Sequence, residues 1–407
     1  MVSFDNTELA FAHQNDSDLK RSKWLFQMMG NTMMLKFGLK AMPLAVRWKI
    51  PFTNQIIRNT IFKQFVGGES LQETKDVVDK LGRHKVKVIL DYGAEGAGSE
   101  ESLDHACAEF IKVIDYASSQ ENIPFISIKV TGIARFNLLE VLHEKMNLSE
   151  KKSILDKYTD ALDMLEAEEK SSWMKSMRRL EDICECAKSK QVSILVDAEE
   201  TWIQDPVDAI TIMMMMKHNQ VKAIVYNTVQ LYRHDRYDFL YESYLHAKEN
   251  NYLPGFKLVR GAYMEKERAR AFSNNYPSPI QPDKTATDND YNRSIKFVLE
   301  HVDEIATIIA THNESSNMLV CQLMKEKNLS ANHPHIHFSQ LYGMSDNITF
   351  NLAHHGFSVS KYLPFGPIHE VIPYLLRRAQ ENSSVSGQTG RELALIEKEW
   401  TRRKSKS

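Results

Sequence analysis

The chain has 407 residues, of which 43% are hydrophobic and 26% are charged, which is typical of a globular protein with one large core or two ordinary ones. Its formal net charge of −2 provides no basic field, so a nucleic acid is not an expected partner. The longest apolar runs, such as residues 209–216, are too short to span a bilayer.

The first seventy or so residues are predicted to be helical and to end at the turn signal Gly67-Gly68. The N-terminus carries Asp5 and Glu8 and has no apolar signal region, so neither a signal peptide nor a transit peptide is expected. The four cysteines are too few and too scattered for a disulfide framework. A reducing, cytoplasmic location is therefore predicted.

Residues 20–68 contain nine Lys or Arg residues and no Asp or Glu. The basic residues alternate with bulky apolar ones, among them Trp24, Phe37 and Trp48. Such a pattern suits a helix that lies on anionic lipid, which predicts peripheral association with the inner face of a membrane. The alternative is that these helices cap the fold and turn their basic side toward the acidic remainder of the chain.

After residue 70, short apolar runs rich in β-forming residues alternate with helical segments. The eight runs cover residues 86–92, 125–130, 192–197, 221–227, 256–261, 306–312, 335–340 and 357–362. Eight parallel strands joined by helices close a (β/α)₈ barrel.

The predicted architecture is therefore α/β: a distorted (β/α)₈ TIM-type barrel over residues 71–390, preceded by the N-terminal helical segment 1–70. Residues 147–190 are longer than a crossover needs and are interpreted as a helical insertion. Residues 391–407 are predicted to be a basic tail that frays.

Each of the eight runs ends near a residue that can do chemistry. A single polar residue at a strand end is explained by a solvent-exposed loop. Eight such residues at corresponding strand ends favour an active site on one face of the barrel. These residues are Asp91, Lys129, Asp197, Asn227 with Gln230, Lys257 with Arg260, His312 with Asn313, Gln340 and Tyr362.

Two motifs at strand ends allow more than one interpretation. Asp197, in VDAEET, suits a base or a partner for an amine, but it suits equally a cap for the next helix. In KLVRGAYMEKE the small residues Gly261 and Ala262 would let a ligand approach the backbone. Neither a GxGxxG nor a phosphate-loop motif occurs, so a flat ring system would lie against the barrel mouth instead.

Histidines are frequent between residues 312 and 355, but alternation along a strand sends neighbours to opposite faces and no HExxH motif occurs. No metal site is expected.

The segment YLLRRAQEN belongs to a helix with two distinct faces at 3.6 residues per turn. Its apolar face comprises Ile368, Ile372, Leu375 and Ala379. Its polar face comprises Tyr374, Arg377, Arg378 and Glu381. The polar face suits an exposed ion pair, and it also suits a forked receptor for a carboxylate.

Taken together, these residues resemble the proline dehydrogenase family. The shared landmarks run in family order over about residues 85–384: IKVTG, VDAEE, VQLY, LVRGAY, ATHN, QLYGM, and YLPFG followed by YLLRRAQEN. The resemblance implies a barrel that binds FAD, oxidises L-proline to Δ1-pyrroline-5-carboxylate in the first step of proline catabolism to glutamate, and passes electrons to membrane quinone. No aldehyde dehydrogenase sequence follows, so the monofunctional form is expected.

The resemblance also implies roles for individual residues. Asp197 and Tyr263 match catalytic residues, and Asp197 is expected to act on the amine side or to hold a cationic cluster. The substrate-binding residues are Lys129, Leu341, Tyr362, Arg377 and Arg378, with the three cations on the carboxylate. The cofactor-binding residues are Ala198, Gln230, Lys257, Val259, Arg260, Gly261, Ala262, Lys284, Thr311, His312, Asn313, Gln340 and Glu381.

Lys257 stands where many bacterial members have arginine, and Met264 replaces a tryptophan seen in some of them. These choices resemble the branch that includes the animal enzymes. A lysine offers a donor near the flavin without the fork of an arginine.

Three other functions remain open at this point. A hydroxyproline dehydrogenase of the same branch would need room for a hydroxyl beside the tyrosine wall, and the retained Tyr362 favours proline. Lys129 also suits the Schiff-base lysine of a barrel aldolase, with the arginine pair on a phosphate. A flavin-free binding or regulatory protein is the third.

Overall fold

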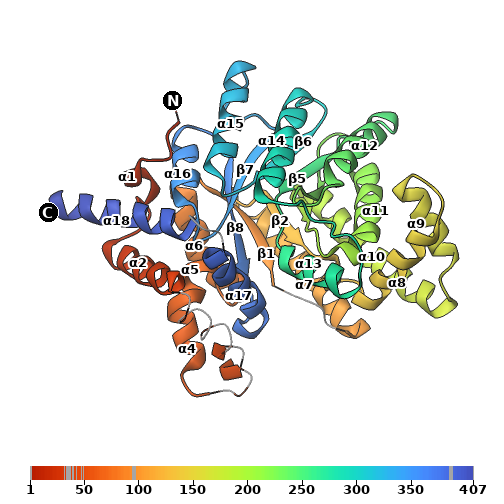
Figure 1. Cartoon of the computed structure of the whole chain (residues 1–407), viewed down its shortest axis with the longest axis horizontal. Coiled ribbons are helices and arrows are strands. Elements are labelled where there is room, and N and C mark those ends of the chain that lie inside the picture. The colour runs from red at the N-terminus through yellow and green to blue at the C-terminus, as the bar shows by residue number, and fades with distance from the viewer. Residues whose placement is uncertain are drawn as a thin grey trace. The chain divides into compact units, whose positions relative to one another are not determined.

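The computed structural model describes residues 2–31, 33, 38, 41–42, 44–46, 48, 50–93, 98–384 and 388–406. Eight strands form a closed barrel in sequence order (Figure 1). They are β1 (Lys87–Tyr92), β2 (Phe125–Ile128), β3 (Ser193–Val196), β4 (Val225–Gln230), β5 (Gly255–Val259), β6 (Ala306–Ala310), β7 (Ile336–Leu341) and β8 (Val359–Phe365). The predicted (β/α)₈ barrel is confirmed.

The chain divides into two compact units, and each is described by itself. The first comprises residues 1–93 and 338–407, and the second comprises residues 94–337. Helices of the first unit are α1 (Thr7–Ala10), α2 (Asp16–Gly30), α4 (Thr53–Ile57), α5 (Lys63–Phe65), α6 (Leu71–Arg83), α16 (Asp346–His354), α17 (Ile368–Ser384) and α18 (Gln388–Lys406). A π-helical turn, Arg58–Phe62, joins α4 to α5.

The core of the first unit lies between the N-terminal helices and the last two helices. Phe26 of α2, Phe65 of α5, Leu375 of α17 and Ile396 of α18 belong to one buried cluster. The four residues of the predicted apolar face of α17 are all buried, as the periodicity predicts.

The predicted frayed tail is instead a packed helix. Leu395 and Ile396 of α18 are buried, and the fully buried Glu399 accepts hydrogen bonds from Arg402 at 2.8 Å and from Arg403 at 2.8 Å. Arg403 also pairs with Asp16 at the start of α2 at 2.8 Å. Composition predicts a charged C-terminal end. The packing of this helix against α2 cannot be predicted from its local sequence, because it depends on a segment at the other end of the chain.

Helices of the second unit alternate with strands β2 to β6. They are α7 (Glu100–Ser118), α8 (Phe136–Leu148), α9 (Ile154–Asp163), α10 (Ala167–Lys190), α11 (Thr201–His218), α12 (Arg236–Glu249), α13 (Met264–Ser273), α14 (Lys284–Glu300) and α15 (Glu314–Glu326). No helix in the described part of the chain is long and apolar enough to cross a membrane.

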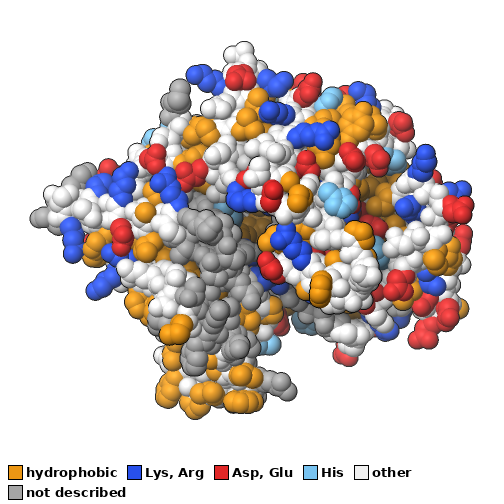
Figure 2. All heavy atoms as spheres, viewed as in Figure 1, with side chains coloured by type: hydrophobic (Ala, Val, Ile, Leu, Met, Phe, Trp, Pro, Cys, Tyr) orange, Lys and Arg blue, Asp and Glu red, His pale blue; other side chains and the backbone are white. Residues whose placement is uncertain are grey.

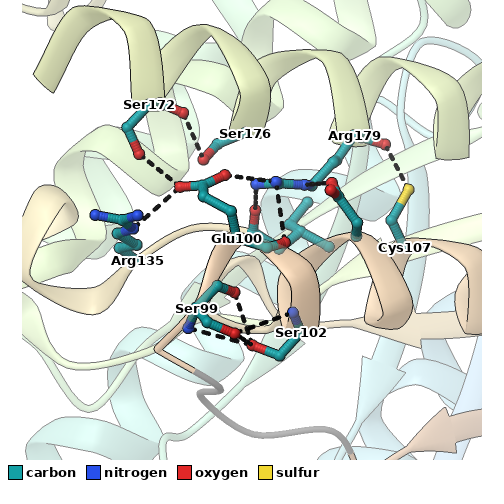
Figure 3. Close-up of polar contacts among 10 residues, drawn as sticks. Ser99, Glu100, Ser102, Cys107, Arg135, Ser172, Ser176 and Arg179 are labelled. Carbon is teal, nitrogen blue, oxygen red and sulfur yellow. Dashed lines mark hydrogen bonds and ion pairs between the residues drawn. The ribbon is translucent and has the colours of Figure 1, made fainter. Parts of the chain in front are cut away.

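The long segment 147–190 contains the end of α8 and all of α9 and α10. Its last helix is joined to α7 by Arg179, which donates to Asp104 at 2.7 Å and to Glu100 at 2.6 Å (Figure 3). Glu100 also accepts from Ser172 at 2.9 Å. Because a barrel crossover needs one helix, two of the three helices between β2 and β3 are additional.

Strand β4 starts later than its apolar run predicts, at Val225 rather than at residue 221. The side chain of Asn219 explains the difference. Its carboxamide accepts from the backbone of Ile224 and Val225, at 2.9 Å each, and donates to Leu253 O at 3.0 Å. The side chain thus satisfies backbone groups that a longer strand would pair.

Gly343, after β7, provides a test of the turn that follows this strand. It has φ +79°, and a Cβ there would lie 2.1 Å from Gln64 O. Gly343→Ala should lower the free energy of unfolding by about 1–2 kcal/mol for the left-handed backbone, and by a further 1–3 kcal/mol for the overlap. Urea unfolding measures the loss.

Gly356→Ala is the matched control, because Gly356 has φ +83° and no atom within 4 Å of the added Cβ. Gly356→Ala should lower the free energy of unfolding only by the cost of the left-handed backbone, about 1–2 kcal/mol. Equal losses in the two variants would contradict the close approach at Gly343.

Candidate active site

A carboxylate between two lysines lies at the ends of three strands of the second unit. Asp197, directly after β3, accepts hydrogen bonds from Ser127 Oγ of β2 at 2.6 Å and from Lys257 Nζ of β5. Lys129 Nζ, just after β2, lies 3.8 Å from the other carboxylate oxygen. The structure therefore brings together three residues that the sequence placed at separate strand ends.

The backbone sets this arrangement. Ser127 and Lys129 are two residues apart, so they leave the extended chain on the same face. The amide of Asp197 donates to Ile128 O at 2.9 Å, which extends the pairing of β3 with β2 by one residue. On β5, Lys257 is in register with Thr228 of β4.

The charge of Asp197 is fixed by its neighbours. Burial alone would raise the pKa of this carboxyl, but Lys257 and Lys129, together with the Ser127 hydroxyl, hold the pKa at about 2. The group is therefore an anion throughout the physiological range. A carboxylate between two ammonium groups stabilises their positive charges, and it is a poor proton acceptor.

A second buried carboxylate supports the loop that carries Lys129. Glu199 accepts from the Thr131 amide at 3.2 Å and from Thr131 Oγ1 at 2.8 Å. Burial raises the pKa of Glu199 to about 7, against the opposing effect of the Thr131 hydrogen bonds. Ser127, Thr131 and Glu199 were missed as site residues, although Ser127 could have been found from its spacing to Lys129.

Gln230 leaves one polar atom without a partner. Its amide nitrogen donates to Glu199 O at 2.9 Å, whereas its side-chain oxygen is buried with no hydrogen-bond partner among the described residues. The whole residue is 2% exposed. Since buried acceptors are normally satisfied, this oxygen indicates a place for a donor that the chain itself does not supply.

Behind these residues lies a hydrogen-bonded network around Asp208 of α11. This fully buried carboxylate accepts from Gln204 at 2.9 Å, from Asn227 at 3.0 Å and from Arg236 at 2.5 Å. Gln204 in turn accepts from the amide of Glu199 at 2.6 Å. The network fixes the positions of β4 and the Glu199 loop.

A second cluster gathers around Asp288 of α14. Arg260, after β5, donates to Asp288 at 2.8 Å, to Thr311 at 2.5 Å and to Ser316 at 3.0 Å. Lys284 also pairs with Asp288. Three of the predicted cofactor-binding residues are therefore held together.

The remaining predicted residues of this unit lie in the strand-to-helix loops. Gly261 has φ +135°, and a Cβ there would overlap the Tyr232 ring at 2.4 Å, so only glycine fits. Gly261 and Ala262 are exposed, and Tyr263 directly precedes α13. Asn313 caps α15 by accepting from Ser316 N at 2.9 Å. Ala198, Val259 and His312 are half-buried.

In the first unit, Gln340 of β7 is buried and accepts from Thr349 at 2.8 Å. Leu341 and Tyr362 are in register on β7 and β8. On α17, the guanidinium of Arg378 lies 5.0 Å from the centre of the Tyr374 ring and Arg377 is half-buried. Glu381 is helical in its backbone, but its side chain lies outside the described part of the structure.

A closed parallel barrel with charged side chains at the carboxyl ends of its strands defines the class of α/β-barrel enzymes. Among the described residues, no group of three His, Cys, Asp or Glu side chains is placed to hold a metal ion.

The model of the proline dehydrogenase family matches residues 74–391. The chain is 33% identical over 344 residues to the carbapenem antibiotics biosynthesis protein CarD of Pectobacterium carotovorum, covering 83% of each chain. It is 32% identical over 380 residues to proline dehydrogenase 1, mitochondrial, of Dictyostelium discoideum, covering 86% of this chain and 66% of that one. It is 31% identical over 368 residues to the hydroxyproline dehydrogenase of Xenopus laevis, covering 85% and 78%.

Among solved structures, proline utilization A (PutA) of Bdellovibrio bacteriovorus matches with a TM-score of 0.69 and 18% identity over 93% of this chain. That match spans 38% of the PutA chain and indicates a shared fold. The chain belongs to the proline dehydrogenase family, and it is an enzyme of that class. The family expected from the sequence landmarks is confirmed.

The Asp197 cluster provides a stability prediction. Because the pKa of Asp197 lies below the ordinary value of 3.8, its contribution is present above that value and is lost as pH falls toward 2. Asp197→Asn should therefore lower the free energy of unfolding by about 3 kcal/mol at neutral pH, since the buried Lys257 and the half-buried Lys129 lose their counterion. Urea unfolding across an acid pH series measures both effects.

Asp79→Asn is the control, because Asp79 pairs with Lys75 at 2.8 Å where both side chains are exposed. It should change stability by no more than about 0.5 kcal/mol. A similar small change for Asp197→Asn would contradict the enclosed cluster.

Proposed function

We propose that this chain is an FAD-dependent proline dehydrogenase that converts L-proline to Δ1-pyrroline-5-carboxylate and passes the electrons to a membrane quinone. The observation that carries the proposal is the Asp197–Lys257–Lys129 cluster, together with the unsatisfied oxygen of Gln230 on the adjacent strand β4, in a chain of this family.

The residues present fit a flavin. The buried Gln230 oxygen would accept from a ring N–H, and Lys257 would offer a donor beside it. The Gly261-Ala262 backbone is exposed and carries no bulky side chain, which suits close approach by a flat group. Arg260, Lys284, Thr311, His312 and Asn313 would complete the site on this side. Bound FAD would supply the hydride acceptor.

Asp197 would act through its charge. With a pKa of about 2 it is too weak a base to remove a proton from a substrate ammonium group near neutral pH. It would orient the amine side of the substrate and hold Lys129 and Lys257 in place. Tyr263 at the start of α13 is the remaining catalytic candidate.

The substrate carboxylate is assigned to Arg377, Arg378 and Lys129, and the apolar ring to Leu341, Tyr362 and Tyr263. The Arg378 guanidinium lies 5.0 Å from the centre of the Tyr374 ring, and this contact supports the assignment, because a guanidinium with restricted freedom binds a planar carboxylate with less further loss. Gln340 and Glu381 would contribute to the cofactor site.

Hydroxyproline is the second candidate substrate, because a relative that is 31% identical carries the name hydroxyproline dehydrogenase. Tyr362 still favours plain proline. The aldolase alternative is disfavoured by the carboxylate 3.8 Å from Lys129, since a Schiff-base lysine must be neutral to react and a neighbouring anion in general favours the ammonium form of a lysine.

The test is the visible spectrum of the purified full-length chain. We expect a flavin spectrum that L-proline bleaches under anaerobic conditions, faster than trans-4-hydroxyproline does. Faster bleaching by hydroxyproline would favour the second candidate. A colourless protein that borohydride traps on Lys129 with a carbonyl substrate would overturn the proposal.

The arginine pair provides a further prediction. Arg377→Met should weaken proline binding by on the order of 2–5 kcal/mol, because a desolvated carboxylate loses its partner, while the flavin stays bound. The concentration dependence of flavin reduction measures this loss. Prolinamide should be a poor substrate of the parent.

Arg293→Met serves as the control, since the Arg293 guanidinium lies over a tyrosine, 3.4 Å from the ring centre of Tyr237, and has no assigned role. Its proline affinity should equal that of the parent. Equal turnover of proline and prolinamide would refute the carboxylate clamp.

A further inference from the structure

The first unit carries an exposed apolar surface on α4 and on the turns that precede it. We call it the apolar apex: Leu44, Trp48, Ile50, Phe52 and Ile56. Trp48 is 69% exposed, Phe52 is 76% exposed and Ile56 is 63% exposed. Figure 2 shows hydrophobic side chains gathered over the α4 end of this unit, and Figure 1 gives the position of that helix.

The apex is the outward side of a segment whose inward side is ordinary core. Ile57, Phe62 and Phe65 are buried in the cluster that also contains Phe26. Successive backbone hydrogen bonds hold the outward residues, with Trp48 N donating to Leu44 O at 2.9 Å and Ile56 N donating to Phe52 O at 3.0 Å. The exposed rings therefore belong to helical turns anchored in the core.

Phe52 is unusual in its backbone as well. It has φ +64° and ψ −6°, the left-handed conformation that bulky residues rarely adopt. Its ring gains little packing in return, because it faces solvent. A bulky residue held in this conformation with its side chain outward indicates a function for the side chain outside the fold.

The charge of the segment favours an anionic partner for the apex. Residues 20–68 contain nine Lys or Arg residues and no acidic residue. Arg21 pairs with Asp18, and Arg58 pairs with Glu69 and Glu73. Lys36, Lys40, Arg47 and Lys49 lie outside the described residues and contribute to the argument through their sequence charge alone.

A two-fold dimer through this surface would place the same basic segment on both sides of the interface, and like charges would repel. An anionic lipid surface is complementary to both properties, because basic side chains bind the headgroups while aromatic and aliphatic ones enter the interface.

We propose that the apolar apex inserts into the interfacial region of an anionic bilayer and is the membrane-docking surface of this protein. This inference rests on the proposed function, because membrane docking would bring the enzyme to a lipid-soluble electron acceptor. The docking itself requires no catalytic activity, so it is tested separately.

The experiment is cosedimentation of the full-length chain with vesicles of phosphatidylcholine alone and of phosphatidylcholine mixed with phosphatidylglycerol. The parent should bind the mixed vesicles, lose most of that binding at high salt, and bind the neutral ones weakly. The emission of Trp48 should shift to the blue on binding, and Trp48→Phe should remove that shift.

The decisive variant is Phe52→Gly with Ile56→Gln. Glycine suits φ +64°, so the fold should be kept or stabilised, while two apolar anchors are lost. Affinity for mixed vesicles should fall about tenfold or more. Phe272→Ser is the matched control, because Phe272 is 89% exposed on α13 and lies outside the basic segment. It should bind like the parent.

Proline-dependent reduction of a soluble dye should be the same in the parent and in the double variant. A parent that binds no vesicles, or a double variant that binds them like the parent, would overturn the docking surface. So would a parent dimer that the double variant abolishes without any vesicle binding. Vesicle binding by a chain that oxidises neither proline nor hydroxyproline would refute the proposed function and leave the docking surface supported.

Discussion

The carboxylate of Asp197, enclosed by two ammonium groups, is the constraint on which the second unit is organised. An isolated carboxylate in that position would be neutralised by burial, and two lysines without it would repel each other. Each charge is therefore tolerable only when the other two are present. For that to happen, β2, β3 and β5 must place Lys129, Asp197 and Lys257 at the same level of the barrel.

The surrounding polar groups hold the segments beside these charged residues in position. Glu199 binds the turn that follows Lys129, and Gln230 binds the carbonyl of Glu199. Gln204 and Asp208 continue the chain of contacts to Arg236 on α12. Because buried polar networks are costly when incomplete, nearly full satisfaction of this one makes the Gln230 oxygen informative. This oxygen and Arg236 Nε are the two side-chain atoms of the network that have no hydrogen-bond partner among the described residues, and the oxygen belongs to β4, the strand paired with the one that carries Lys257.

The sequence allowed the strands and the apolar face of α17 to be predicted, because both follow from local periodicity. The (β/α)₈ order and the buried residues Ile368, Ile372, Leu375 and Ala379 are of this kind. The contacts of Asp197 with Ser127 and Lys257 join residues separated by 70 and 60 positions, so no local pattern contains them. The packing of α18 also depends on distant partners, and the late start of β4 depends on a side-chain contact of Asn219 that an apolar pattern does not contain.

In the N-terminal segment, composition predicted a property of the surface but not its partner. The absence of acidic residues from 20–68 was visible in the sequence, and it suited both a cap that faces the rest of the chain and a surface that faces lipid. The exposed side chains of Trp48 and Phe52 favour the second interpretation, because a cap would bury them. Periodicity alone had no means of distinguishing the two, since the same apolar residues can turn inward or outward.

Two buried ion pairs in the second unit show why one of them is assigned to function. Asp208 and Arg236 are almost completely inaccessible, and the Asp208 carboxylate already accepts three side-chain hydrogen bonds from within the chain. Asp197 keeps 15% of its side chain exposed and lies beside loops that carry exposed backbone. Buried ion pairs are seldom more stable than apolar residues of the same shape. Stability is therefore a weak reason to keep charge at the barrel mouth, whereas the orientation of a charged substrate requires it.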